Sequence, residues 1–280
     1  MNRRLQLVDV FHGEPLSGNP LAVVFDAEGL TAQEMQQVTR WLNLSETAFL
    51  LAPTSSDADY RVRIFTLDRE MPFAGHPTLG TCHAWLAAGG KPRGSTRIVQ
   101  ECGAGLIPIR REDDRLAFAA PGLIRSGPVE EGKLEEIAQV LRIKRSDIVD
   151  AQWADNGPGW IAILLASAEA VLAVEPARHH PTRLDIGLVG PYPPDGPLAF
   201  ELRAIFSDHR RSLVEDPVTG SLNASVAQWL LATGRAMAPY IAAQGACVGR
   251  AGRIYIDRDA SGTVWVGGRT TTLVSGNCSV

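Results

Sequence analysis

The sequence has 280 residues, of which 45% are hydrophobic and 21% are charged, with 27 glycines and 18 prolines. This composition is typical of a soluble globular protein with room for two cores of ordinary size, and it excludes disordered and fibrous classes. The formal net charge of -4 predicts no basic surface for a nucleic-acid backbone.

The first part of the chain alternates polar and apolar residues in short runs, which predicts strands around one helix. Strands are expected at residues 5–12, 21–25, 47–51 and 61–66, and a helix at residues 31–41. Thr31 and Glu34 form a capping box at the start of this helix, after which Met35, Val38, Trp41 and Leu42 share one face. The strand at residues 47–51 is apolar on both faces, so we expect it to be central.

The segment at residues 70–80, EMPFAGHPTLG, recurs in altered form at residues 215–221, EDPVTGS. Adding 145 to the numbers of six residues reaches an identical residue each time: Glu70, Pro72, Gly75, Leu86, Ala87 and Gly89. Upstream, Ile64 and Phe65 match Ile205 and Phe206, four residues out of that register. The chain is therefore interpreted as a duplicated unit.

Each copy of this segment precedes a nearly uncharged helix, which such a composition predicts to be buried on most sides. Pro77 suits the first helical position, so the first of these helices is expected at residues 78–88 and the second at residues 223–231. Further strands are expected at residues 97–100, 105–109, 116–119, 159–165, 202–206, 254–257, 263–267 and 271–274, with short helices at 134–141 and 167–174. The proline-rich stretch 176–197 is predicted to be an irregular surface excursion.

These elements predict an α+β fold of two pseudo-symmetric domains, residues 1–121 and 122–280. Each is expected to be a curved mixed β-sheet or barrel wrapped around a central helix, and the terminal strand is free to cross back to the first domain.

Chemistry is expected at the two helix starts, because Gly75 and Gly220 let a ligand approach free backbone N–H groups closely. If the pseudo-twofold axis brings Gly75 and His76 opposite Gly220 and Ser221, two sets of amide donors hold one carboxylate. The alternative is that these glycines only serve a tight turn, and their repetition in both copies favours the ligand site.

Three titratable residues are candidates for proton transfer. Glu46 begins an apolar strand and is either a solvated rim residue or a desolvated base with a raised pKa. Asp216 is either an ordinary turn acid or a group that takes a proton or binds a substrate amine. His76 is either a capping residue or, kept neutral by the helix dipole, a proton donor or acceptor.

Other site classes are not indicated. The remaining histidines have no metal-ligand spacing, and the sequence has no Gly-x-Gly-x-x-Gly, phosphate loop or Gly-x-Ser-x-Gly elbow. The four cysteines are far apart and are expected to be reduced and buried: Cys82, Cys102, Cys247 and Cys278. Asp9 and Glu14 interrupt any N-terminal apolar core, and no apolar run reaches the ~20 residues of a spanning helix. A cytoplasmic protein without metal, nucleic-acid or membrane partners is expected.

Four motifs in this order resemble the PhzF-like isomerases of phenazine biosynthesis. They are GNPLAV at residues 18–23, SETAF at 45–49, PFAGHPTLG at 72–80 and EDPVTGS at 215–221, and the tail from residue 244 to residue 268 resembles that family as well. The resemblance covers the whole chain. It implies the diaminopimelate epimerase-like fold and a reaction that needs no cofactor.

The resemblance also implies roles for individual residues. Glu46 is expected to be the proton-shuttling base and acid, flanked by His76 and Asp216. The carboxylate of the substrate would be bound by Gly75, Gly220 and Ser221, and Ser45 would help to fix it. The related racemases place cysteines where this chain has His76 and Ser221, so a two-thiol mechanism is disfavoured. Val218 and Leu222 depart from the common pattern of this motif, and Leu222 and Asn223 are expected to line the pocket.

The leading hypothesis is a cofactor-independent isomerase that shifts a proton on a small carboxylate such as trans-2,3-dihydro-3-hydroxyanthranilate, in a cleft between the domains. Two alternatives stay open: a Glu-dependent epimerase of an amino acid-like metabolite, and a ligand-binding or interaction protein without turnover on the same scaffold. Relatives in this family are often dimers, so a homodimer is also an expected assembly.

Overall fold

The computed structural model of the chain describes residues 2–94 and 97–280. It contains two compact units. Unit 1 comprises residues 1–119 and 267–280, and unit 2 comprises residues 120–266. The C-terminal strand therefore belongs to the same unit as the N-terminal strand.

Unit 1 is a mixed sheet with both antiparallel and parallel neighbours. Its elements are β1 (Asn2–Val10), β2 (Asn19–Val24), α1 (Ala32–Leu42), β3 (Glu46–Leu51), β4 (Tyr60–Thr66), β5 (Glu70–Met71), α2 (Gly75–Ala87), β6 (Arg97–Cys102), β7 (Gly105–Arg111), β8 (Leu116–Ala119) and β18 (Thr270–Ser279). The strand order is β18-β1-β2-β3-β4-β6-β7-β8, with β5 paired to β4. The β2–β3 and β4–β6 pairs are parallel and the others are antiparallel. β3 is thus central, as predicted.

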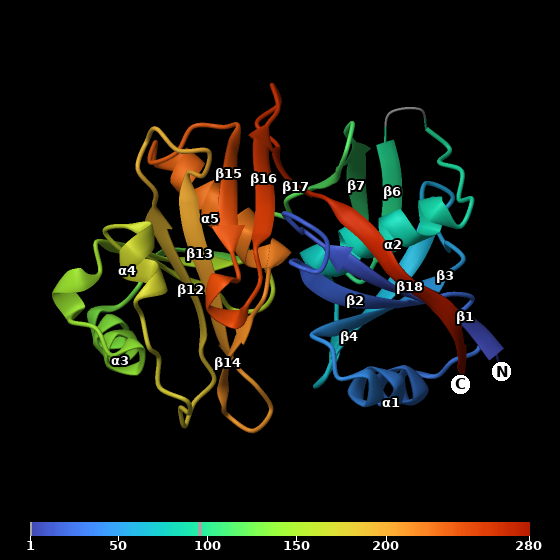
Figure 1. Cartoon of the computed structure of the whole chain (residues 1–280), viewed down its shortest axis with the longest axis horizontal. Helices are drawn as coiled ribbons and strands as arrows, with labels where there is room; N and C mark the ends of the chain where they lie inside the picture. The colour runs from blue at the N-terminus through green and yellow to red at the C-terminus, as the bar shows by residue number, and fades with distance from the viewer. Residues whose placement is uncertain (1, 95–96) are drawn as a thin grey trace. The chain divides into compact units, whose positions relative to one another are not determined.

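The central helix of unit 1 is α2, which contacts β1, β2, β3, β8 and β18 and lies among these strands in Figure 1. It begins at Gly75, earlier than predicted, so Pro77 is its third residue. A proline is tolerated there because the first N–H groups of a helix have no partner within it. Gly80 allows the close approach of α2 to β2, since a Cβ atom would lie 2.5 Å from Leu21.

The other helix of unit 1, α1, lies outside the sheet against β3 and β4. Its predicted capping box between Thr31 and Glu34 is confirmed. The prediction for Trp41 was wrong, because its side chain is 83% exposed. The buried position belongs instead to Thr39, whose hydroxyl is satisfied by donating to the carbonyl of Met35.

Unit 2 repeats this arrangement. Its elements are β9 (Arg125–Pro128), α3 (Glu131–Leu141), the 3-10 turn η1 (Arg145–Asp147), β10 (Asp150–Asp155), β11 (Ile161–Leu164), α4 (Ala168–Leu172), β12 (Asp185–Pro191), β13 (Phe200–Ser207), β14 (Leu213–Asp216), α5 (Gly220–Ala232), β15 (Tyr240–Gln244), the 3-10 turn η2 (Ala246–Val248), β16 (Gly252–Arg258) and β17 (Val264–Gly268). The strand order is β9-β10-β11-β12-β13-β15-β16, with β14 on β13. The β11–β12 and β13–β15 pairs are parallel.

The order of the seven strands of unit 2 matches the run β18-β1-β2-β3-β4-β6-β7 of unit 1, with α5 in the place of α2 and α4 in the place of α1. Matching ion pairs fix the register. Arg63 on β4 binds Glu70 on β5, and Arg203 on β13 binds Glu215 on β14. The second arginine follows the first by 140 residues, so Ile64 matches Ala204 and the predicted match to Ile205 was one residue off.

The proline-rich stretch at residues 176–197 was predicted wrongly, because it contains the buried central strand β12. Its glycines serve packing. A Cβ atom on Gly187 would lie 2.2 Å from Leu222 of α5, and one on Gly190 would lie 2.3 Å from the carbonyl of Ser167. β12 occupies the place in unit 2 that β3 occupies in unit 1.

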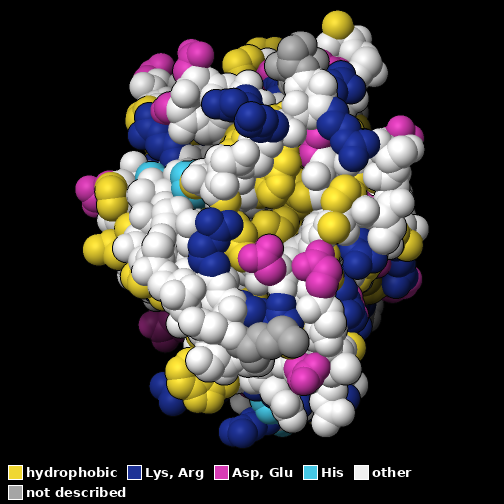
Figure 2. All heavy atoms as spheres, turned by 90° about the vertical axis from the view of Figure 1, so that its right-hand side faces the viewer, with side chains coloured by type: hydrophobic (Ala, Val, Ile, Leu, Met, Phe, Trp, Pro, Cys, Tyr) yellow, Lys and Arg dark blue, Asp and Glu magenta, His cyan; other side chains and the backbone are white. Residues whose placement is uncertain are grey.

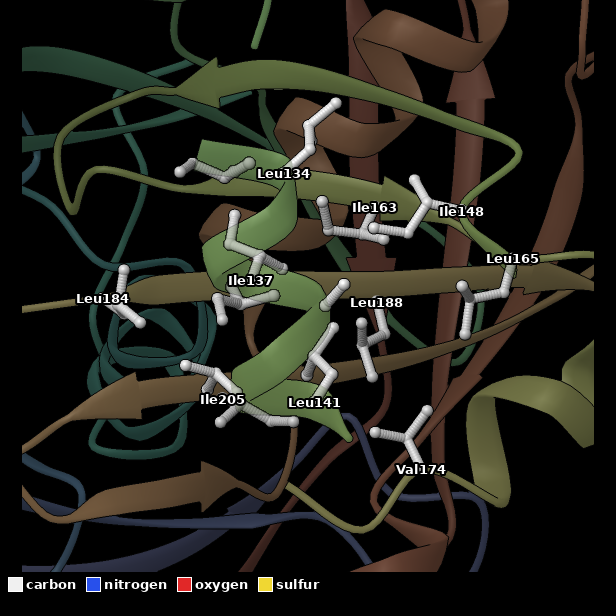
Figure 3. Close-up of a cluster of buried hydrophobic side chains, with 14 of the residues drawn as sticks. Leu134, Ile137, Leu141, Ile148, Ile163, Leu165, Val174, Leu184, Leu188 and Ile205 are labelled. Carbon is white, nitrogen blue, oxygen red and sulfur yellow. The ribbon is translucent and has the colours of Figure 1, made fainter. Parts of the chain in front are cut away.

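The outer face of the unit 2 sheet is covered by α3, whose apolar residues pack onto β11, β12 and β13 (Figure 3). This cluster includes Leu134, Ile137 and Leu141 of the helix and Ile163 and Leu188 of the strands. The sheet of unit 2 is thus packed on both faces, by α5 on one and by α3 and α4 on the other.

The surface agrees with the small net charge. Figure 2 shows one face of the molecule, with positive and negative side chains interspersed around a group of hydrophobic ones. Among the described residues, no helix has the length and apolar character needed to cross a bilayer. All four cysteines are free. Cys82 and Cys102 are buried as predicted, but Cys247 is exposed and Cys278 is half-buried.

Candidate active site

The two central helices begin differently from the peripheral ones. The first N–H groups of a helix need acceptors, and Thr31 and Ser167 supply them to α1 and α4. The N-cap residues of α2 and α5, Ala74 and Thr219, make no side-chain cap bond, although Gly75, His76, Gly220 and Ser221 are all buried. α3 also lacks a side-chain cap, but its start is exposed to water. Buried, uncapped helix starts are favourable sites for an anion.

In unit 1, the start of α2 lies beside the first residue of β3. Pairing of Glu46 with Leu21 and Thr66 fixes the backbone of that residue between two strands. Its Oε2 lies 3.5 Å from Nε2 of His76, and the exposed fractions of the two side chains are 17% and 3%. Glu46 is therefore largely desolvated, and its carboxylate lies beside the imidazole of His76.

The proton on His76 is placed by Asn19, the first residue of β2. The amide Nδ2 of Asn19 donates to Nδ1 of His76 at 3.4 Å. Since Nδ1 accepts, the neutral ring carries its hydrogen on Nε2, which faces Glu46. Burial lowers the pKa of His76 to about 3. The carboxylate of Glu46 opposes this shift, but loss of hydration is the larger effect. The ring is neutral at pH 7, as predicted, although burial and not the helix dipole is the cause.

In unit 2, Asp216 ends β14 and the hydroxyl of Thr219 donates to its Oδ2 at 2.5 Å. Gln244 at the end of β15 is bonded to both ends of this short loop. It donates to the carbonyl of Asp216 and to the hydroxyl of Thr219, and it accepts from the N–H of Thr219 and from Asn223. The stretch before α5 is thereby held in one conformation.

Ser221, the second residue of α5, is oriented by two side chains. The indole N–H of Trp160 donates to its Oγ at 3.1 Å, and Asn156 donates to its carbonyl at 2.8 Å. An indole nitrogen can only donate, so Oγ accepts from it and the hydroxyl hydrogen of Ser221 remains available to a ligand. Together with the helix N–H groups, it forms a set of donors suited to a carboxylate.

Equivalent positions of the two units carry different chemistry. Arg63 and Arg203 are equivalent, so the residues three positions after them, Thr66 and Phe206, are equivalent too. Thr66 pairs with Glu46 on the neighbouring strand, and Phe206 pairs with Asp185. Asp185 is thus the counterpart of Glu46, but Arg183 binds it through two hydrogen bonds of 2.9 and 3.1 Å. At this position of the described chain, unit 1 places a desolvated carboxylate beside an imidazole, and unit 2 places a carboxylate bound by an arginine.

Comparison with known proteins identifies the family. The model of the phenazine biosynthesis-like protein family (PhzC-PhzF) matches residues 8–276. The chain belongs to this family. It is 33% identical over 273 residues to trans-2,3-dihydro-3-hydroxyanthranilate isomerase of Pseudomonas aeruginosa, a match that covers 92% of this chain and 91% of that protein. The predicted resemblance to PhzF-like isomerases is confirmed, and the chain is an enzyme of the isomerase class.

Two further matches extend this picture. Antisense-enhancing sequence 1 of Schizosaccharomyces pombe is 40% identical over 177 residues, which is 60% of this chain and 60% of that protein. A crystal structure of a protein described as a predicted epimerase, from Pseudomonas aeruginosa, superposes with a TM-score of 0.81 at 26% identity and covers 99% of both chains. The α+β, epimerase-like fold predicted for this PhzF-like chain is confirmed.

The residues predicted for the site fall into two sets. Ser45, Glu46, Gly75 and His76 lie around the start of α2 in unit 1, and Asp216, Gly220 and Ser221 lie around the start of α5 in unit 2. Leu222, expected to line the pocket, packs in the core of unit 2 against Gly187. Asn223 is committed to Gln244 and to the carbonyl of Thr219.

Sequence reasoning assigned no role to the residues that orient this PhzF-like site. Asn19 and Gln244 lie inside motifs that carried the resemblance, so those motifs could have indicated them. Thr219 lies within the repeated segment, where only its neighbours were considered. Trp160 lies in a predicted strand, but nothing in the sequence indicated that it contacts Ser221. Asp185 could be found only through strand register, and the wrong prediction for residues 176–197 prevented this.

Proposed function

We propose that this PhzF-like chain is a cofactor-independent isomerase that moves a proton between two carbon atoms of a small carboxylate. Glu46 is the base and acid. The observation that carries the proposal is its desolvated carboxylate, 3.5 Å from the N–H of a neutral imidazole, at the start of a buried and uncapped helix.

Proton removal from carbon leaves negative charge on the substrate, which must be stabilised for the step to be fast. Glu46 takes the proton from one carbon and becomes a carboxylic acid, while the electron pair delocalises into the substrate. The same acid then returns the proton to another carbon, so the atoms balance without a second reagent. His76, with a pKa too low for a proton carrier at neutral pH, serves as a hydrogen-bond donor.

The substrate carboxylate is assigned to the donor sets of the helix starts. In unit 2 these are the N–H groups of Gly220 and Ser221 and the hydroxyl that Trp160 leaves available. The proposal puts the substrate in a cleft between the units, so that both helix starts serve one ligand. Its support is that each unit contains one such buried, uncapped start.

An isomerase is favoured over an epimerase by the inequality of the two units. Inversion at carbon is most simply done with a base on one face and an acid on the other. The counterpart of Glu46 is Asp185, which is already bound by Arg183. A single carboxylate that removes and returns the proton on the same face fits a positional shift. Since a relative 33% identical is named trans-2,3-dihydro-3-hydroxyanthranilate isomerase, this compound is the first substrate to test.

The test is incubation with trans-2,3-dihydro-3-hydroxyanthranilate in heavy water, followed by NMR and mass spectrometry of the product. Wild type is expected to form isomerised product with deuterium at carbon, because the acid form of Glu46 exchanges its proton with the solvent before it returns one to the substrate. Glu46→Gln is expected to lose at least about 100-fold in rate, the contribution of a general base. Glu135→Gln, an exposed glutamate of α3, is the matched control and should keep full activity.

Three outcomes would contradict the proposal. Undiminished exchange in Glu46→Gln would remove Glu46 from the mechanism. Inversion at a stereocentre without a shift of the double bond would indicate an epimerase. Ligand-induced thermal stabilisation across a panel of aromatic and alicyclic amino acids, with no exchange into any of them, would indicate a binding protein.

A further inference from the structure

The polarity of the hydrogen bonds around Asp216 can be followed from a single backbone group. The N–H of Thr219 must donate, and it lies 3.0 Å from Oε1 of Gln244, so this oxygen is the acceptor. The other terminal atom of Gln244 is therefore the nitrogen Nε2. Its two hydrogens are directed to the carbonyl of Asp216 at 3.1 Å and to the hydroxyl of Thr219 at 3.0 Å.

This fixes the hydroxyl of Thr219 in turn. Because its oxygen accepts from Gln244, its own hydrogen is directed to the other neighbour, Oδ2 of Asp216, at 2.5 Å. An oxygen that receives such a hydrogen bond acts as an acceptor, and this arrangement favours the ionised carboxylate. Thr219 occupies the N-cap position of α5 but its side chain does not cap the helix.

The network is not a requirement of the fold. Unit 1 builds the same step from strand to helix with Ala74 at the position of Thr219 and Met71 at the position of Asp216, neither of which can form these bonds. In unit 2 Gln244 is 1% exposed and uses all four of its hydrogen-bonding sites. Unit 2 thus contains a network of side-chain hydrogen bonds that unit 1 lacks, although unit 1 forms the same step from strand to helix.

We infer that Thr219 and Gln244 are positioning residues that hold Asp216 as an ionised hydrogen-bond acceptor, aimed at a donor group of the substrate, an ammonium or hydroxyl. Asp216 then does not supply the transferred proton, and that role belongs to Glu46 alone. The reference to a substrate rests on the proposed function, but the ionisation of Asp216 does not.

The other charged groups near β14 are the same in wild type and in a variant changed at Thr219. They are Glu215 on the same strand, Arg203 and Glu201 on β13, and Arg250 beyond η2. A change at Thr219 alters none of them, so a comparison of variants isolates the hydroxyl.

The experiment is an NMR titration of the full chain labelled with ¹³C at the aspartate carboxyl carbon. The signal of Asp216 is assigned by its loss in Asp216→Asn. In Thr219→Val the titration midpoint of this signal is expected to rise by about one to two pH units, the value of a hydrogen bond to a charged group. Thr219→Ser should restore the wild-type midpoint, and Thr219→Ala replaces the valine variant if that variant does not fold.

The matched control is Thr233→Val, which removes a threonine hydroxyl bonded to backbone carbonyls at the other end of α5. Its midpoint for Asp216 should be that of wild type. An unchanged midpoint in Thr219→Val, or a wild-type Asp216 that is protonated at pH 6, would overturn the inference whether or not the chain turns over any substrate.

A second readout applies once the isomerase assay succeeds. The acidic limb of the pH profile of kcat/KM should move to higher pH in Thr219→Val by the same amount, and return in Thr219→Ser. A fall in activity with an unmoved limb would mean that Thr219 acts through stability alone, and would also overturn the inference. Absence of isomerase activity in wild type would count against the proposed function and leave the titration result intact.

Discussion

The buried imidazole of His76 should make folding stability depend on pH in a defined window. Its pKa falls from the ordinary value of 6.5 to about 3 in the folded state because burial removes the hydration of the charged ring. Between these values the unfolded chain binds one more proton than the folded chain. The stabilisation is therefore fully present above about pH 6.5 and is lost as the pH falls towards 3.

The size of the loss follows from the width of this window. Each pH unit inside it costs about 1.4 kcal/mol of unfolding free energy, so acidification to pH 4.5 should cost about 2 to 3 kcal/mol through this one residue. The neighbouring carboxylate of Glu46 stabilises the protonated ring. The loss of about 2 to 3 kcal/mol in unfolding free energy is therefore an upper value.

The assay compares wild type with His76→Gln by urea unfolding at pH 7.0, 5.5 and 4.5. Wild type should lose about 2 to 3 kcal/mol more than the variant across this range. His179→Gln, at an exposed histidine, is the control and should follow wild type. Equal pH slopes for wild type and His76→Gln, or an NMR titration of the His76 ring with a midpoint near 6.5, would refute the argument.

Three shorter predictions follow from other contacts. Arg203→Met should lower the free energy of unfolding in urea by about 3 to 5 kcal/mol, because it leaves the 10% exposed Glu215 without its cation. Arg63→Met, at the equivalent but more exposed pair, should lower it by less than about 1 kcal/mol. Similar losses in the two variants would contradict the argument from burial. Ser221→Ala should raise KM of the isomerase about 10-fold or more with a smaller change in kcat, and an unchanged KM would remove that hydroxyl from carboxylate binding. Trp41→Gln should leave the unfolding free energy within about 0.5 kcal/mol, as expected for an 83% exposed side chain, and a larger loss would show that Trp41 packs in the core.

The sequence predicted the fold class well because duplication constrains topology more strongly than local propensity does. The repeated segment indicated two units with one central helix each, and the structure shows that α2 and α5 occupy equivalent places. Propensity failed where the local composition disagreed with the tertiary role. Prolines hid the buried strand β12, and the polar residues of β10, DAQWAD, gave no apolar alternation to detect.

The site was predictable as a set of residues but not as a set of contacts. Glu46, His76 and Asp216 could be named from their positions beside the repeated segment. The direction of each hydrogen bond could not be predicted, because the side chains that make these bonds reach the helix starts from strands that are distant in sequence. They are Asn19, Trp160 and Gln244.

The position of β18 in the chain has a consequence for synthesis of the protein. β18 pairs along β1 from Thr270 to Ser279, so unit 1, which contains Glu46 and His76, lacks one of its strands until residues 270–279 have been synthesised. During synthesis, the N-terminal part of unit 1 therefore remains without this strand while unit 2 leaves the ribosome. Unit 1 is accordingly completed after unit 2, and a stop codon before residue 270 would remove a strand from the unit whose other strands were synthesised first.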